Sequence, residues 1–90
     1  MNNTERMAEL ARTFPALEGV DGGSPFDPRK LERAAETLSS GGVHAVRFLL
    51  AVWNANVKWE VGPFEVVRAF WTWDSDHRAA FNWASDPWTA

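Results

Sequence analysis

The first hydrophobic pattern of the chain lies in its N-terminal segment. Its apolar residues recur at intervals of three, one and three: Met7, Leu10, Ala11 and Phe14. This spacing places them on one face of a helix, so we predict a first helix over residues 4–14. Proline at position 15 ends it, and the three glycines and two prolines between residues 15 and 26 predict a linker or an extended wrap.

A second helix is predicted to begin at Asp27-Pro28. An aspartate side chain accepts free backbone N–H groups of a first helical turn, and proline fits the first helical position. The apolar stripe that follows consists of Leu31, Ala34, Ala35 and Leu38. The run Ser39-Ser40-Gly41-Gly42 predicts a turn that ends this helix, with a serine that caps the next one.

Residues 43–53 carry the widest apolar face of the chain. Six large side chains form it: Val46, Phe48, Leu49, Leu50, Val52 and Trp53. His44 and Arg47 fall on the remaining polar stripe, where we expect His44 to be solvated. A helix that is apolar over more than half its circumference must be covered on two sides, so we predict that this third helix is central.

Two further helices are predicted in the last third of the chain. Residues 63–73 form a helix with one polar stripe of Glu65, Arg68 and Thr72, because a strand would mix polar and apolar residues on both faces. A final helix spans residues 76–84, capped by Asp74 or Ser75. Between the third and fourth helices, alternating apolar residues at 57–61 allow a short extended segment, but with no obvious partner strand we expect it to be irregular.

The predicted fold is therefore an all-α, compact single-domain bundle of four to five short helices with a Trp-rich core. Residues 1–90 form one domain: a helix over 1–14, the linker over 15–26 and a helical core over 27–90. All six tryptophans follow residue 52, which places the core in the C-terminal half. Trp71 and Trp73 lie about 200° apart on a helix, and we expect them to face two different neighbours in that core.

Charge and composition exclude several classes of function. Nine basic and twelve acidic residues are scattered along the chain, which argues against direct nucleic-acid binding because that needs a concentrated basic surface. The absence of cysteine excludes disulfides and thiolate metal sites and fits a cytoplasmic protein. The longest apolar stretch, residues 48–53, is far too short to cross a membrane.

Three segments of the C-terminal half carry a resemblance to other proteins. They are Arg47-Phe48-Leu49-Leu50-Ala51-Val52-Trp53-Asn54, Trp73-Asp74 with His77-Arg78-Ala79-Ala80-Phe81, and Trp83-Ala84-Ser85-Asp86-Pro87-Trp88. Together they resemble a group of short bacterial proteins of unassigned function that are often found on mobile elements. The resemblance covers residues 43–88 and implies no activity, but it favours a role in phage or plasmid biology.

The densest cluster of polar residues is Asp74, Asp76 and His77, with Asp86 near it if the chain returns there. Carboxylates and an imidazole at close range are able to hold a metal or move a proton. Helix capping explains the same residues more simply, since acidic side chains complement a helix N-terminus. We therefore interpret His77 as a partly buried structural histidine and expect no catalytic residue, no cofactor and no obligatory metal.

The function indicated is that of a small non-enzymatic protein-binding module. The surplus of apolar surface predicts an interface, formed either with another protein or with a second copy of the chain. The most specific form of this hypothesis is a phage- or mobile-element-encoded inhibitor of a host defence or nucleic-acid enzyme. The alternatives are a metal-binding or hydrolytic protein centred on Asp74, Asp76 and His77, and an accessory subunit of a larger assembly.

Interface candidates come from the C-terminal half: Trp88, Trp59, Glu65, Arg68 and Thr72. Trp88 follows Asp86-Pro87, beyond the last predicted helix, and is either an exposed anchor or a side chain that folds back into the core. Trp59 also lies outside the predicted helices. Rigid aromatic residues concentrate binding energy in interfaces, which is why these two lead the prediction.

Overall fold

The protein is built from five α-helices and two short 3-10 helices within the residues that the computed structural model describes, 3–54 and 56–85, with side chains described as far as residue 82. The α-helices are α1 (Asn3–Thr13), α2 (Pro28–Ala34), α3 (Ser40–Trp53), α4 (Val66–Thr72) and α5 (Ser75–Ser85). The 3-10 helices are η1 (Pro15–Leu17) and η2 (Ala35–Thr37). No strand occurs in these ranges, and the predicted all-α fold is confirmed.

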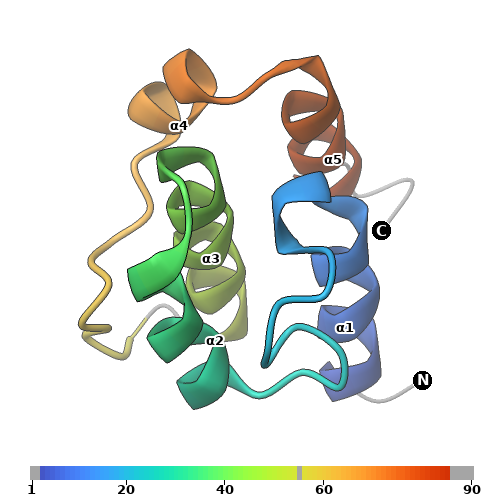
Figure 1. The fold of residues 1–90 in the computed structure, drawn as a ribbon, viewed down its shortest axis with the longest axis vertical. Helices are drawn as coiled ribbons and strands as arrows, with labels where there is room; N and C mark the ends of the chain where they lie inside the picture. Colours follow the sequence, from blue (N-terminus) through green and yellow to red (C-terminus); the bar gives the residue numbers. More distant parts are fainter. Residues whose placement is uncertain (1–2, 55, 86–90) are drawn as a thin grey trace.

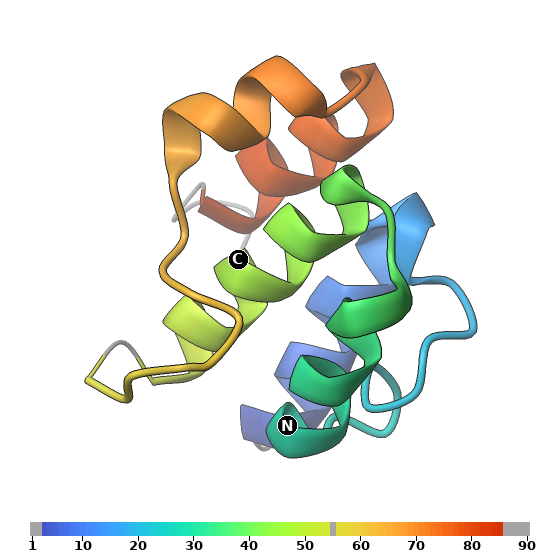
Figure 2. The ribbon, with the colours of Figure 1, turned by 60° about the vertical axis from the view of Figure 1, so that its left-hand side comes forward.

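Helix α3 is the centre of the arrangement. It contacts α1, α2, α4 and both 3-10 helices. In Figure 1, α1 and α5 lie on one side of α3 and α2 lies near its lower end. Figure 2 shows α4 across the end of the molecule at which α3 begins. The prediction that the third helix is central is therefore confirmed.

The predicted helix starts are confirmed at Asp27 and Ser39. Asp27 Oδ1 accepts hydrogen bonds from the backbone N–H groups of Arg29 and Lys30, at 3.1 and 3.2 Å. Ser39 Oγ accepts one from the N–H of Gly42, at 3.4 Å. The expected turn at residues 41–42 is wrong, because a serine cap leads directly into a helix and both glycines lie in the first turn of α3.

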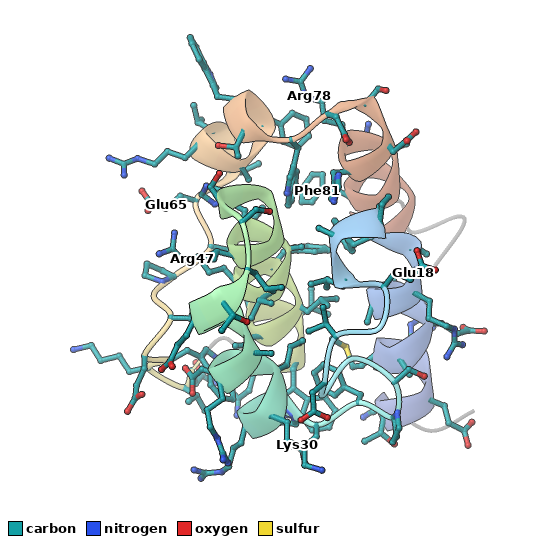
Figure 3. The ribbon with its side chains drawn as sticks, in the orientation of Figure 1. Glu18, Lys30, Arg47, Glu65, Arg78 and Phe81 are labelled. Atoms are coloured by element: carbon teal, nitrogen blue, oxygen red, sulfur yellow. The ribbon has the colours of Figure 1, made fainter. Side chains whose placement is uncertain are left out.

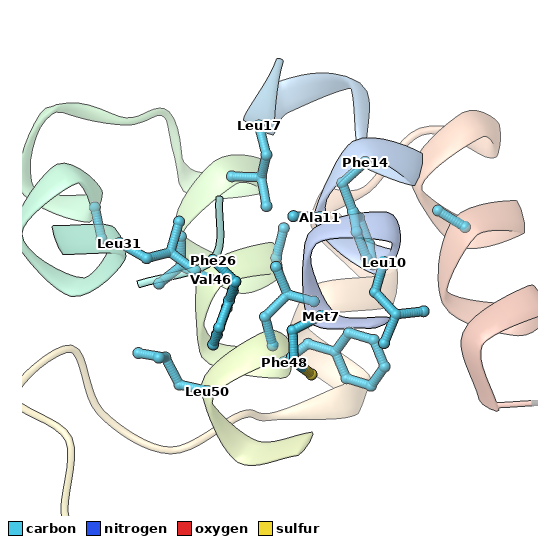
Figure 4. Close-up of a cluster of buried hydrophobic side chains, with 14 of the residues drawn as sticks. Met7, Leu10, Ala11, Phe14, Leu17, Phe26, Leu31, Val46, Phe48 and Leu50 are labelled. Carbon is cyan, nitrogen blue, oxygen red and sulfur yellow. The ribbon is translucent and has the colours of Figure 1, made fainter. Parts of the chain in front are cut away.

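Both halves of the chain build the core, so the prediction of a C-terminal core is wrong. Phe14, Leu31, Leu49 and Leu50 are completely buried. Figure 4 shows side chains from α1, the following loop and α3 meeting in one cluster. The N-terminal half contributes aliphatic and phenylalanine side chains, which fill space as well as tryptophan does.

The segment between α1 and α2 is more ordered than predicted, because residues 15–17 form η1 and turns follow. The segment between α3 and α4 is irregular over its described residues 56–65. This was expected for residues 57–61, but the helix predicted from residue 63 begins only at Val66. Two hydrogen bonds hold that segment against the helices. Arg47 Nε donates to the carbonyl of Val61 at 2.7 Å, and Glu32 Oε2 accepts from the Val61 N–H at 3.3 Å.

Candidate functional site

The outer face of α4 carries the largest exposed apolar side chains of the described protein. Trp71 is 84% exposed, and Val67, one helical turn before it, is 66% exposed. Val66 at the start of the helix is 46% exposed. Residues four apart on a helix lie on one face, so Val67 and Trp71 form a continuous apolar strip, which we call the α4 ridge.

The expectation that Trp71 faces the core is wrong. Trp73, two residues later, is only 3% exposed. Side chains two positions apart point in nearly opposite directions along a helical turn, so α4 buries one indole and exposes the other. Trp73 has the core environment that was expected, but Trp71 has none, because nothing in the described chain covers the outer side of α4.

The predicted polar stripe borders this ridge. Glu65, Arg68 and Thr72 are all exposed. Glu65 Oε2 and Arg68 Nε are 3.4 Å apart, and Thr72 Oγ1 donates to the Arg68 carbonyl at 2.9 Å. Figure 3 shows Glu65 and Arg78 at the end of the molecule formed by α4 and the beginning of α5. The interface candidates of α4 therefore lie together on one surface.

The underside of α4 is fixed firmly to the rest of the protein. The Trp73 indole donates from Nε1 to the carbonyl of Gly41, at 2.9 Å. Its ring packs within 6.4 Å, centroid to centroid, of five other rings: Phe14, Phe64, Phe70, His77 and Phe81. Arg78 adds hydrogen bonds from Nε and Nη2 to the carbonyl of Phe70, at 2.9 Å from Nε. The α4 ridge therefore lies on a helix whose opposite side is packed against aromatic rings.

The polar cluster at the start of α5 is a helix cap, as interpreted from the sequence. Asp74 Oδ1 accepts from the backbone N–H of His77 at 3.0 Å and lies 2.7 Å from His77 Nδ1. His77 Nε2 accepts the N–H of Ala16 at 3.0 Å, so Nδ1 carries the proton that it donates to Asp74. Both ring nitrogens serve structure, and the ring is buried.

The metal alternative draws no support from this geometry. No group of three His, Asp or Glu residues placed to hold an ion occurs in the described part of the chain. Asp76 is exposed, and Asp86 lies outside the described residues. The partial burial predicted for His77 is in fact nearly complete, because its ring stacks on Trp73 at an interplanar angle of 17°.

The capping hydrogen bonds give a first testable prediction. They lower the pKa of Asp74, mainly through the backbone N–H of His77 and then through its ring. A lowered carboxyl pKa stabilises the fold above about pH 4, and the contribution disappears as the pH falls below that value. We expect Asp74→Ala to lower the melting temperature at pH 7. Between pH 4 and pH 2 the melting temperature of this variant should fall less than that of the wild type.

Asp76→Ala is the matched control for this change. Asp76 lies in the same turn but only complements the helix dipole, so its loss should be smaller than that of Asp74. A chelator should leave both melting temperatures unchanged. A chelator-sensitive melting temperature that Asp74→Ala abolishes would show instead that the cluster holds a metal.

His44 differs from its predicted position. The ring is 8% exposed, and Nδ1 is buried without a hydrogen-bond partner. The expectation that His44 is solvated is wrong: α4 packs on α3, and Arg68 of α4 and its cap residue Glu65 act electrostatically on the ring. Burial is the main cause that lowers the pKa of His44, followed by the charge of Arg47. No pattern in the sequence identified which helix would cover this stripe.

A hollow of about 960 Å³ lies in the loop between α1 and α2. Its charged lining residues include Arg12, Asp27 and Lys30. Asp27 is engaged as the cap of α2, and Arg12 donates to Ser24 Oγ at 2.9 Å. No histidine contributes to the lining. The two hydroxyl side chains of the lining, Thr13 and Ser24, are both engaged in hydrogen bonds within the protein.

The remaining sequence candidates are the two tryptophans outside the helices. Trp59 is partly buried against the core, and its Nε1 donates to the Asn54 carbonyl at 3.1 Å. Its indole therefore holds the loop after α3 in place, and only part of it is available as a contact surface. Trp88 lies outside the described residues, so both interpretations of it stay predictions.

Comparisons with protein-family models, with curated proteins and with solved structures found no match to the chain. Among the helices that the structure describes, none combines the length and apolarity needed to cross a membrane.

Proposed function

We propose that this chain is a small protein-binding module without a reaction of its own, and that its contact surface is the outer face of α4. The observation that carries the proposal is the exposure of Trp71, at 84%, on a helix whose opposite side is packed against the core. The exposure is a consequence of the helix geometry and does not reflect loose packing beneath it.

Energetics favour a partner for this residue. Covering an indole removes roughly 150–250 Å² from water. At about 25 cal/mol per Å², that burial stabilises a complex by about 4–6 kcal/mol before the costs of association. Tryptophan and arginine are also the residues most often found at the energetic centre of an interface, and Arg68 borders Trp71 here.

The shape of the surface indicates a groove in a different protein. Val67 and Trp71 provide the spacing of four residues by which a helix seats in an apolar groove. A stable dimer needs about 800 Å² from each partner, and the ridge presents only two large side chains. A deep apolar groove surrounds both side chains and therefore removes more of their surface from water than contact with the same ridge of a second copy would. Carboxylates at the groove rim would complement the exposed Arg68 and Arg78.

The resemblance of residues 43–88 to short proteins of mobile elements makes the proposal more specific. The entire α4 surface lies within that range. We propose that the partner is a host defence or nucleic-acid enzyme and that seating α4 in its groove inhibits it. An accessory subunit of a larger assembly would use the same surface, whereas no observation favours the hydrolytic alternative.

The test is direct binding by purified proteins. Partners are captured with the wild-type chain from its cell of origin, identified and purified, and their affinity for Trp71→Ala is then measured. We expect Trp71→Ala to weaken binding at least tenfold, about 1.4 kcal/mol, with an unchanged melting temperature.

A pair of valines provides the matched control. Val67 on α4 and Val52 at the end of α3 are both half exposed or more, and both lie on helices. Val67→Ala should weaken binding and Val52→Ala should not. Equal effects at the two positions would exclude the α4 surface. A dimer in solution that Trp71→Ala dissociates would show that the occupant is a second copy.

A further inference from the structure

The buried nitrogen of His44 lies beneath the proposed contact surface. Nδ1 has no hydrogen-bond partner, although the ring is more than nine-tenths buried. Buried polar atoms are almost always paired, because an unpaired one loses its hydration without compensation. A neutral histidine limits this loss, since it places its proton on Nε2 and leaves only a lone pair at Nδ1.

Protonation of His44 is opposed by its surroundings. A second proton would create an N–H at Nδ1 with no acceptor. The charged groups that act on the ring are Arg47 from α3, and Glu65 and Arg68 from α4 and its cap. Glu65 favours the cation, but its carboxylate is already paired with Arg68, and burial together with both arginines opposes it. The packed position therefore favours the neutral ring.

We propose that His44 makes the seating of α4 on α3 sensitive to pH, so that protonation of this ring weakens that packing and increases the fraction of molecules in which the ridge of Val67 and Trp71 is lost. The consequence for binding rests on the proposed function. The release of α4 itself does not, and it is measurable without any partner.

Helix α4 is short, and its first four residues, 66–69, carry no ring that joins the aromatic cluster around Trp73. It has seven residues, of which Ala69 is buried completely. Short elements with few buried contacts open locally at a lower free energy than the whole protein unfolds. Once α4 separates, His44 regains water, and its preference for the proton returns to that of a free imidazole.

The direction of the pH effect follows from this difference. The pKa of His44 is lowered while α4 is in place, so the open state binds a proton more readily. Seating of α4 is strongest above about pH 6.5, the ordinary histidine value, and weakens as the pH falls through the range below it. The second histidine, His77, lies in α5 and gives a separate NMR signal.

Amide hydrogen exchange on the intact chain tests the proposal. The reporters are the N–H groups of Ala69 and Trp73, which donate to the carbonyls of Glu65 and Ala69 at 2.9 and 2.8 Å. We expect their protection, corrected for intrinsic exchange, to fall roughly fivefold from pH 7.5 to 5.5. Amides in α1 should change less, because global unfolding would affect all helices alike.

His44→Leu provides the matched variant. An apolar side chain of similar length keeps the packing and removes the titration, so protection of α4 should become independent of pH over this range. If this variant does not fold, the proposal is tested by following the NMR signal of the His44 ring in the wild-type chain as the pH is changed. A midpoint at or above pH 6.5, or unchanged α4 protection in wild type, would overturn the proposal.

The proposed function and the proposed pH sensitivity of α4 can be rejected independently of each other. Trp71→Ala should keep the pH response of α4 while losing the partner. A pH response without any Trp71-dependent partner would leave the switch intact and reject the proposed function. Partner binding through Trp71 with α4 protection that does not change with pH would reject the switch alone.

Discussion

Replacing Trp73 with alanine is expected to lower the free energy of unfolding by about 3–5 kcal/mol, the range for truncating a buried large aromatic side chain. The indole is 3% exposed and lies at the centre of a cluster of rings from four parts of the chain. It also donates a hydrogen bond to the carbonyl of Gly41, and the substitution removes that bond. Urea denaturation monitored by circular dichroism measures the loss.

Trp71→Ala is the matched control, because it removes the same side chain two residues away. Its ring is exposed, so the free energy of unfolding should change by about 0.5 kcal/mol or less. Trp73→Phe should lose about 1 kcal/mol, since it keeps most of the packing and removes the hydrogen bond. Comparable losses for Trp71→Ala and Trp73→Ala would contradict the two environments described for α4.

Local signals in the sequence were sufficient for most of the helices, although α4 begins at Val66 and not at residue 63. Asp27-Pro28 and Ser39 act through hydrogen bonds to their own first turns, so their effect does not depend on distant residues. The stripe of α1 predicted its buried face for the same reason. Asp74 was interpreted correctly as a cap because its partner, the N–H of His77, is three residues away.

Features that depend on contacts between distant elements were not predictable in this way. His44 was assigned to a solvated stripe, but it is buried in the folded protein, in which α4 packs on α3. The near-complete burial of His77 requires Ala16, sixty-one residues earlier in the chain. Trp71 has an apolar side chain on an apolar helix, and periodicity alone does not show which part of a wide apolar arc is left uncovered.

The second prediction of large effect concerns Gly22 in the loop before α2. Its φ of +91° lies in the left-handed region, and a Cβ there would come within 2.8 Å of both the Asp27 carbonyl oxygen and Leu31 Cα. These are backbone atoms of the start of α2, which cannot rotate away. Gly22→Ala should cost about 2–5 kcal/mol, from 1–2 for the backbone conformation and 1–3 for displacing α2.

Gly19→Ala separates these two contributions. Gly19 has a φ of +72°, but a Cβ there meets nothing within 4 Å. Its substitution should therefore cost only the backbone share, about 1–2 kcal/mol. Thermal and urea unfolding of both variants measure the difference, which reports how tightly the loop is held against α2. Equal losses of unfolding free energy at the two positions would mean that the loop moves away from α2 without cost. Leu31, which is completely buried, would then stay in the core without the close approach of Gly22.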